Sequence, residues 1–200
     1  MEGLAEIDRL DRSVTLAING LHSPVTDTIW QFFSNKEIWF VLYAAVIVSL
    51  FIRLGWKKAL VVIGSCILCV LACDQIGNLV KETVARLRPC EDQFMLDQGL
   101  RMLEGPGGLY GFYSAHAANA MGFAICSIIG FRSDVTRSYK AYSIFIVIWA
   151  VLVGVSRVFV GKHFLGDVLA GFVAGLLFGW LCGALGRLII KKLEKKGSAT

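Results

Sequence analysis

The amino-acid sequence predicts an all-α helical transmembrane bundle, with about five membrane-spanning helices and an amphipathic helix at the N-terminus. Three observations lead to this prediction. Of the 200 residues, 56% are hydrophobic and 18% are charged, whereas soluble domains carry about 25% charged residues. The hydrophobic residues form long blocks, and basic residues cluster between the blocks and at the C-terminus. The length fits a single membrane-embedded domain of residues 1–200.

Residues 1–22 are expected to form the amphipathic helix, because apolar residues recur there at helical spacing with charges between them. These apolar residues are Leu4, Ile7, Leu10, Val14, Ile18 and Leu21. The helix either lies on the membrane surface or packs on the rest of the protein, and both alternatives stay open. Interrupting acidic residues and the lack of a basic start argue against a signal peptide. Ser23 and Pro24 end the helix, and a short aromatic segment follows.

Five apolar blocks follow, each long enough to cross a bilayer once as a helix of roughly 20 residues. The blocks are 37–53, 58–80, 113–131, 141–158 and 166–189. They are expected to be helices rather than strands, because backbone polar groups in lipid must be hydrogen-bonded within the segment. Tryptophans near the block ends, including Trp39, Trp56 and Trp180, are interpreted as interface or packing residues.

The basic residues predict how the chain crosses the membrane. They lie between the first and second blocks, between the third and fourth, and in the tail 187–200, which all fall on one side of a five-crossing chain. The positive-inside rule makes this side cytoplasmic. The same distribution argues against nucleic-acid binding, because a basic tail after an apolar segment is typical of an anchor that faces anionic lipid. The outward loop contains Lys81, Arg86, Arg88 and Arg101. The positive-inside rule disfavours basic residues there, so their presence indicates a functional role.

The six cysteines do not predict a disulfide framework. Five of them lie inside apolar blocks, where cysteine behaves as a small hydrophobic residue; they are Cys66, Cys69, Cys73, Cys126 and Cys182. Only Cys90 lies in a polar loop. The spacing of Cys66 and Cys69 lacks the second ligand pair and the βαβ context that a zinc or redox site needs.

One polar cluster near the outer ends of the last two blocks indicates a nucleophile. Ser156 and Arg157 are followed by His163 and, four residues later, by Asp167. If Asp167 opens the last helix, the two side chains share a face. A carboxylate that holds one imidazole nitrogen leaves the other free to attack, so His163 is the candidate nucleophile.

Two further clusters supply groups that bind an anion. Ser114, Ala115 and His116 open the third block, where free backbone N–H groups bind anions and His116 can protonate a leaving oxygen. Lys81 and Arg88 end the second block and offer a point charge and a planar fork for phosphoryl oxygens. Phosphoryl transfer needs this combination of positioning and charge. The sequence contains no cluster of carboxylates arranged to bind a metal ion. The basic side chains are therefore expected to stabilise the phosphoryl charge in place of a metal, and no cofactor is predicted.

Together these three clusters resemble, in order and spacing, the signature motifs of the type 2 phosphatidic acid phosphatase superfamily, whose members are membrane lipid phosphatases related to haloperoxidases. The matching stretches are Lys81-x6-Arg88-Pro89, Tyr113-Ser114-Ala115-His116 and Ser156-Arg157-x5-His163-x3-Asp167, so the resemblance covers the motif-bearing region 81–167. Tyr113 and Ala115 depart from the family's proline and glycine. Alanine keeps the close backbone approach but reduces the conformational freedom of the loop, so the effect of both departures on the oxyanion geometry stays open.

The resemblance implies a phosphohistidine intermediate on His163, with Asp167 orienting the ring and His116 protonating the departing lipid oxygen. It also implies that Lys81, Arg88, Ser114, Arg157 and the amides of Ala115 and His116 hold the phosphate. The expected reaction is metal-independent hydrolysis of a lipid phosphomonoester or pyrophosphate. Candidate substrates are undecaprenyl pyrophosphate, phosphatidylglycerophosphate, phosphatidic acid and lipid A phosphates. The partners are then the lipid phosphate and the bilayer, with no obligatory protein partner, in a bacterial inner membrane with the site facing the periplasm or exterior.

Several polar residues carry a structural interpretation beside a functional one. Asp74 and Asn78 share a helix stripe with Lys81, and a hydrogen-bonding role between helices is favoured over catalysis. Arg86 either assists the phosphate or faces the loop. Lys162 is interpreted as a snorkelling anchor. The acidic residues of the outward loop are expected to be solvated; they are Glu91, Asp92, Asp97 and Glu104.

Two other functions compete with the phosphatase. A non-hydrolytic lipid binder or transporter could retain the phosphate pocket, but binding alone needs only the cations and not His116, His163 and Asp167. A vanadate-dependent haloperoxidase has a similar pocket, but such enzymes are soluble. The sequence leaves the preferred lipid and the oligomeric state open.

Overall fold

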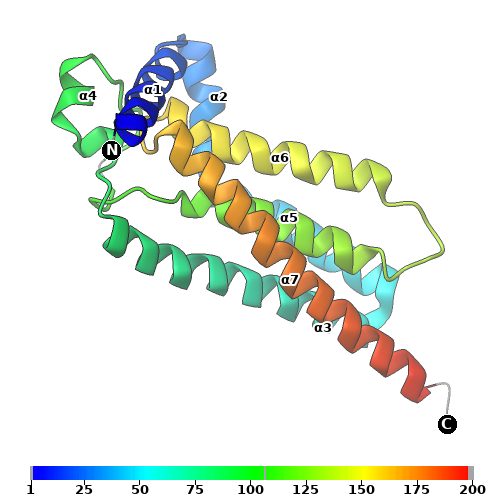
Figure 1. Ribbon diagram of the computed structural model, residues 1–200. Coiled ribbons are helices and arrows are strands. Elements are labelled where there is room, and N and C mark those ends of the chain that lie inside the picture. The colour runs from blue at the N-terminus through cyan, green and yellow to red at the C-terminus, as the bar shows by residue number, and fades with distance from the viewer. Residues whose placement is uncertain (1, 106, 198–200) are drawn as a thin grey trace.

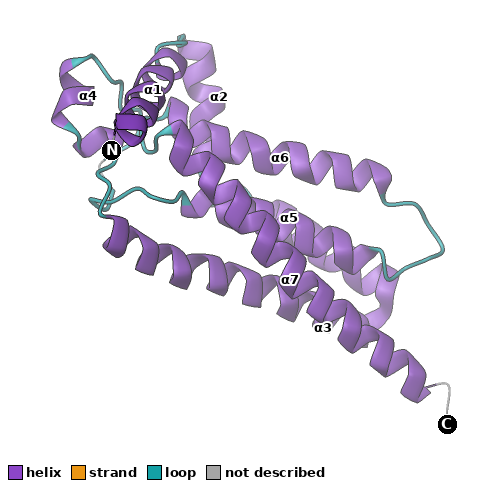
Figure 2. Cartoon of the chain, viewed as in Figure 1, coloured by secondary structure: helices purple, strands orange, loops and turns teal. Residues whose placement is uncertain are grey.

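The chain folds into a helical bundle, as predicted, in a computed structural model that describes residues 2–105 and 107–197 (Figures 1 and 2). The helices are α1 (Glu2–Asn19), α2 (Pro24–Ser34), α3 (Phe40–Val84), α4 (Gln93–Asp97), α5 (Ala115–Phe131), α6 (Lys140–Phe159) and α7 (Leu165–Gly197), with a 3₁₀ turn at Pro89–Glu91. Within these residues the β-structure is limited to one isolated bridge between Leu87 and Tyr110. Pro106, in the outer loop, and the last residues of the basic tail, 198–200, lie outside the described residues.

The five predicted apolar blocks coincide with five helical segments. Helix α3 contains the first two blocks, because Gly55 leaves the helical region with φ +73° and ψ 164° and divides α3 into two arms. In the described part of the chain, three helices are long and apolar enough to cross a membrane, namely α3, α6 and residues Leu165–Lys196 of α7. Helix α5 is apolar but shorter, with 17 residues. The protein is therefore an integral membrane protein, and the count of five crossings stays a prediction.

Small residues hold α5 against α7, and this contact positions the end of α5 that carries His116. A Cβ atom on Gly175 would lie 2.4 Å from the carbonyl oxygen of Ala118, and one on Gly179 would lie 2.7 Å from that of Gly122. Backbones approach this closely only where side chains are absent, which is the usual way in which membrane helices gain packing energy.

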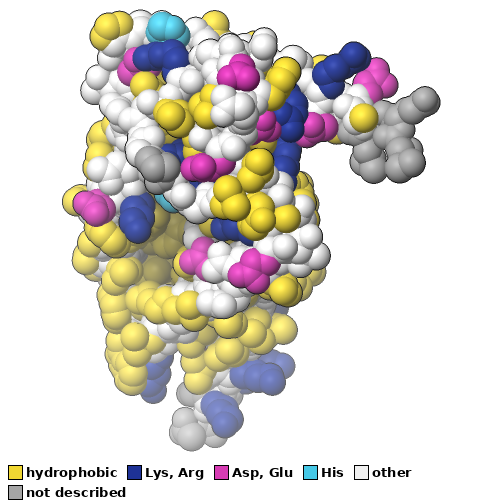
Figure 3. Space-filling view, turned by 90° about the vertical axis from the view of Figure 1, so that its left-hand side faces the viewer, with side chains coloured by type: hydrophobic (Ala, Val, Ile, Leu, Met, Phe, Trp, Pro, Cys, Tyr) yellow, Lys and Arg dark blue, Asp and Glu magenta, His cyan; other side chains and the backbone are white. Residues whose placement is uncertain are grey.

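The three basic regions meet at one end of the bundle, as the predicted topology requires. Arg53 Nη2 lies 3.3 Å from Asp134 Oδ2, which joins the turn of α3 to the α5–α6 loop. Lys58 pairs with Glu194 near the end of α7. Helices α1, α2 and α4 gather at the opposite end (Figure 1). Charged side chains crowd that end of the molecule, and hydrophobic ones dominate the body below it (Figure 3).

Of the two alternatives for the N-terminal helix, the structure shows packing on the bundle. Thr15 and Asn19 of α1 are buried, and the Asn19 side chain accepts from Arg101 N at 2.8 Å and donates to Phe159 O at 2.9 Å. Ile7 and Leu10 remain exposed on another face of α1. The break after α1 is confirmed, and the aromatic segment that follows is helix α2, whose N-terminus has a capping box at Ser23.

Two expectations about the outer loop are wrong. Asp92 is buried and lies 2.5 Å from Arg12 Nη1, and Glu104 accepts from Arg157 Nη1 at 3.2 Å, so neither is a solvated loop charge. Cations turned into the protein need a nearby counter-charge, and these carboxylates provide it. Cys90 is buried as well, because the loop folds back over the end of the bundle.

Candidate active site

The turn between α6 and α7 places His163 and Asp167 against each other. Gly161 has a φ of +77°, and the carbonyl oxygen of Arg157 accepts from His163 N at 3.2 Å, which closes a tight turn. Asp167 Oδ2 then accepts from Phe164 N at 3.0 Å in the first turn of α7. The predicted pairing four residues apart is therefore observed, with His163 just ahead of the helix.

His163 lies between a carboxylate and a cation. Its Nδ1 is 3.4 Å from Asp167 Oδ2, and its Nε2 is 3.4 Å from Arg88 Nη1. The ring is only 2% exposed. Burial lowers the pKa of His163 to about 4, although Asp167 works in the opposite direction. The imidazole is thus neutral at pH 7, and a proton assigned to Nδ1, facing the carboxylate, leaves a lone pair on Nε2.

The second oxygen of Asp167 is held by Arg86. Arg86 Nη1 donates to Asp167 Oδ1 at 2.8 Å, and the carboxylate is fully buried. Arg86 therefore takes neither of the two roles weighed from the sequence, since its guanidinium faces Asp167 rather than the loop surface or His163 Nε2. The pairing was not predictable because spacing along the chain does not relate residues 86 and 167.

The start of α5 offers unpaired donors beside the histidine. Ser114 N donates to the carbonyl oxygen of Asp167 at 3.0 Å, which joins α5 to the first turn of α7. The Ser114 hydroxyl is buried and, among the described residues, has no hydrogen-bond partner. The following N–H groups of α5 lack intrahelical acceptors, so an oxyanion fits here. His116 stands in the first turn of this helix, two residues after Ser114.

The two departures in the second motif have different structural settings. Tyr113 is buried, its hydroxyl donates to Cys73 O at 2.9 Å, and its ring fits against Gly77. This contact ties the loop before α5 to the second arm of α3. Ala115 opens α5 itself, with ordinary helical geometry.

The remaining cations and polar groups divide into two sets. Arg88 faces His163, whereas Arg157 Nη1 donates to Ser34 and Glu104, and the Nε atom of Arg157 is buried without a hydrogen-bond partner in the described part of the chain. Lys81 is half-buried at the end of α3, with Nζ 3.5 Å from Asn78 Oδ1. Asp74 accepts from Asn119 at 2.8 Å and thereby links α3 to α5.

The prediction that Lys162 is a snorkelling anchor is wrong, since the residue is only 4% exposed. Its ammonium donates to Gly105 O, and both this ammonium and the Arg88 guanidinium flank Gly107. Burial lowers the pKa of Lys162. The only sequence signal was its place next to His163, at a position that the motif leaves open.

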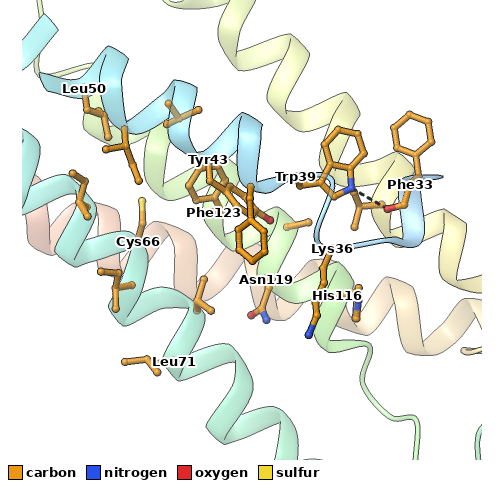
Figure 4. A pocket seen from close by; sticks show the side chains of 18 of the residues that line it. Phe33, Lys36, Trp39, Tyr43, Leu50, Cys66, Leu71, His116, Asn119 and Phe123 are labelled. Carbon is orange, nitrogen blue, oxygen red and sulfur yellow. Dashed lines mark hydrogen bonds between the residues drawn. The ribbon is translucent and has the colours of Figure 1, made fainter. Parts of the chain in front are cut away.

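An apolar cavity of about 460 Å³ opens beside His116. It lies between the two arms of α3 and the first half of α5, and Figure 4 shows Leu50, Leu71 and Phe123 along its wall. At its polar end, His116, Lys36 and Asn119 line the same space. The volume is in the range of small-molecule and lipid sites, roughly 300–1,000 Å³. A ligand with an ionic head and an apolar tail fits this arrangement.

The geometry favours transfer of a phosphoryl group from an apolar leaving group. A neutral imidazole backed by a carboxylate faces Arg88, and the helix N-terminus that carries the Ser114 hydroxyl lies beside it. The described residues contain no group of three or more His, Cys, Asp or Glu side chains arranged to hold a metal ion.

Comparison with known proteins supports this assignment of chemistry. Residues 58–187 match the model of the PAP2 superfamily. The chain is 34% identical to a lipid A 4'-phosphatase of Bacteroides thetaiotaomicron over 187 residues, covering 92% of this chain and 80% of that protein. It is 33% identical to a lipid A 4'-phosphatase of Porphyromonas gingivalis, covering 90% of this chain and 72% of that protein.

A solved structure shares the fold. The crystal structure of a transmembrane PAP2-type phosphatidylglycerolphosphate phosphatase from Bacillus subtilis superposes with a TM-score of 0.73 at 21% sequence identity. The match covers 92% of this chain and 88% of that one. At this identity the likeness speaks for the fold alone.

Proposed function

The chain belongs to the PAP2 superfamily and is a membrane lipid phosphatase, and from that premise we propose that it removes a phosphate from a lipid A-type substrate through a phosphohistidine on His163. The observation that carries the proposal is the position of His116, which lines the apolar cavity and stands two residues after Ser114, whose N–H donates to Asp167 O at 3.0 Å. A phosphate bound at His163 therefore has its lipid leaving group next to His116.

In the first step, His163 Nε2 attacks phosphorus and the bond between phosphorus and the lipid oxygen breaks. His116, which becomes protonated when the negatively charged phosphate binds beside it, gives that proton to the oxygen, which leaves as the lipid alcohol. The proton on His163 Nδ1 stays with the ring, and Asp167 Oδ2 stabilises the positive charge that develops there. Arg88, Arg157 and Ser114 hold the equatorial oxygens as charge builds on them.

The second step regenerates the enzyme. Neutral His116 takes a proton from water, the hydroxide oxygen bonds to phosphorus, and the bond between phosphorus and His163 Nε2 breaks. Inorganic phosphate leaves, and both histidines return to their starting states. We assign the charge stabilisation to Arg88, Arg157, Lys162 and Lys81, so the reaction is proposed to run without a metal ion.

Lipid A is the preferred substrate class because both lipid A 4'-phosphatases match nearly the whole chain. The cavity accepts part of an acyl chain from the membrane side, between the arms of α3.

The test is phosphate release by purified protein in detergent from a panel of lipid A, phosphatidylglycerophosphate, phosphatidic acid and undecaprenyl pyrophosphate, with EDTA present. The highest kcat/KM is expected for lipid A, and mass spectrometry should show loss of the 4'-phosphate. His163→Ala is the matched control and should release none. Preference for another lipid would overturn the substrate, whereas activity that EDTA removes and magnesium restores would overturn the metal-free mechanism.

We also propose that the site faces the periplasm in a bacterial inner membrane. All six native cysteines are buried, so single cysteines can be introduced as reporters at Met102, near the site, and at Val135, which is 92% exposed at the basic end. A small impermeant thiol reagent applied to intact cells should label Met102→Cys and spare Val135→Cys. The reverse pattern would place the site on the cytoplasmic face.

A further inference from the structure

The N-terminus of α7, which carries Asp167, is capped from the opposite end of the sequence. The first N–H groups of a helix have no intrahelical acceptors. Here Leu165 N donates to Thr15 Oγ1 at 3.0 Å, and Gly166 N donates to Asp11 Oδ1 at 2.8 Å. Thr15 is fully buried. A carboxylate in this position also meets the positive end of the helix dipole, so α1 stabilises the first turn of α7.

The same carboxylate of Asp11 also holds Arg86. Asp11 Oδ2 accepts from Arg86 Nη2 at 2.7 Å, and the other terminal nitrogen of Arg86 contacts Asp167. Asp8 Oδ1 accepts from Arg86 Nη2 at 3.0 Å, and the guanidinium lies over the Phe164 ring, 4.0 Å from its centroid. Burial opposes the charge of Arg86, but Asp167 and Asp11 outweigh it and raise its pKa.

Asp167 is consequently fixed on both oxygens. Oδ1 faces Arg86, and Oδ2 faces Phe164 N and His163 Nδ1. A fully buried carboxylate is stable only when it is paired and hydrogen-bonded in this way. Arg86 thus makes its contacts with carboxylates and a ring, in contrast to Arg88, whose Nη1 faces His163 Nε2.

We infer that α1 is a positioning element of the reaction, in which Asp11 holds Arg86 and the start of α7 so that Asp167 orients His163. The inference rests on the proposed roles of His163 and Asp167, and it gives the amphipathic helix a task besides membrane contact. Its exposed face, with Ile7 and Leu10, is separate from the face that carries Asp11 and Thr15.

The test compares three variants of the full-length protein with the parent: Asp11→Asn, Arg86→Gln and the double variant. Asp11→Asn keeps an oxygen acceptor for the helix and removes the charge that faces Arg86. Each single variant should lower kcat by about 10- to 100-fold, the range found for partners that orient the ligands of metal sites in the same way. The KM and the inhibition constant of inorganic phosphate should stay within about twofold, because the phosphate-binding cations are untouched. Glu6→Gln, an exposed charge change on the same helix, is the matched control and should equal the parent.

The double variant should lose no more activity than the more impaired single variant, since both act through one set of contacts. Arg88→Gln is the comparison for a phosphate-binding cation and should raise the inhibition constant of phosphate. The inference is overturned if Asp11→Asn has the kcat of the parent. It is also overturned if Arg86→Gln raises the inhibition constant of phosphate as much as Arg88→Gln does, or if the loss of kcat disappears when activity is normalised to the folded fraction. A parent that hydrolyses no phosphate ester would instead overturn the proposed function.

Discussion

A single methyl group added at Gly111 tests the geometry around His163. Gly111 lies in the loop before α5, and a Cβ atom there would be 3.0 Å from Asp167 Oδ2, 3.2 Å from Arg88 Cγ and 3.4 Å from His163 Nδ1. The methyl group of Gly111→Ala therefore reaches the three groups that the mechanism requires. Asp167 and Arg88 must shift by a few tenths of an ångström, because their distances to the new methyl group are shorter than ordinary van der Waals contact.

The expected magnitude follows from this crowding. Overpacking costs about 1–3 kcal/mol, and if the strain falls on the reacting groups it lowers kcat/KM by about 5- to 150-fold. The backbone contact of Gly111 N with Arg86 O, at 2.9 Å, does not depend on the side chain, so the fold should survive. Gly108→Ala is the matched control in the same loop, since nothing lies within 4 Å of its added Cβ atom.

The assay is steady-state phosphate release from a lipid phosphate, with thermal unfolding of each variant in detergent measured in parallel. Gly108→Ala should stay within about twofold of the parent. Full activity in a folded Gly111→Ala variant would refute the reasoning, because the groups around this loop would then not be those that react.

Three further predictions concern charge, pH and packing. Lys162→Met should lower kcat/KM by about 10²–10³-fold, the usual effect of losing one preorganised donor, and raise the inhibition constant of phosphate; an unchanged constant would return Lys162 to an anchoring role. Because burial lowers the pKa of His163 to about 4, its neutral, nucleophilic form persists above that pH, so the acid limb of kcat/KM due to this group should lie near pH 4; a limb near 6.5 assigned to His163 would contradict this. Gly175→Ala should lower the free energy of unfolding by about 1–3 kcal/mol, since its Cβ would meet Ala118 O at 2.4 Å, whereas Gly64→Ala, with open space around it, should not destabilise the protein.

Much of the fold was predictable because each membrane helix is recognisable from one continuous stretch of apolar residues. The apolar blocks correspond to five helical segments, and the basic residues correctly predicted that two connecting regions and the C-terminal tail share one end. The pair of His163 and Asp167 was predictable for the same reason, since four residues along a chain near a helix start define their relative position.

The contacts that hold the pair in place were not predictable in this way. Asp11 meets Gly166 across 155 positions, and Glu104 meets Arg157 across 53. No periodicity relates such residues, so the sequence predicts a solvated charge at Glu104 and assigns no partner to Asp11. The apolar cavity was missed because its walls come from α2, α3, α5 and α6 together.

The central claim is a covalent phosphate on His163, and trapping that intermediate tests it most directly. Protein mixed with a ³²P-labelled lipid phosphate and quenched in alkali within milliseconds should carry label that is stable to base and lost in acid, as phosphohistidine is. Peptide mapping should place it on His163, and His116→Ala should accumulate it from a substrate with a good leaving group. Label absent from a protein that turns over the same lipid, or found on another residue, would contradict the account.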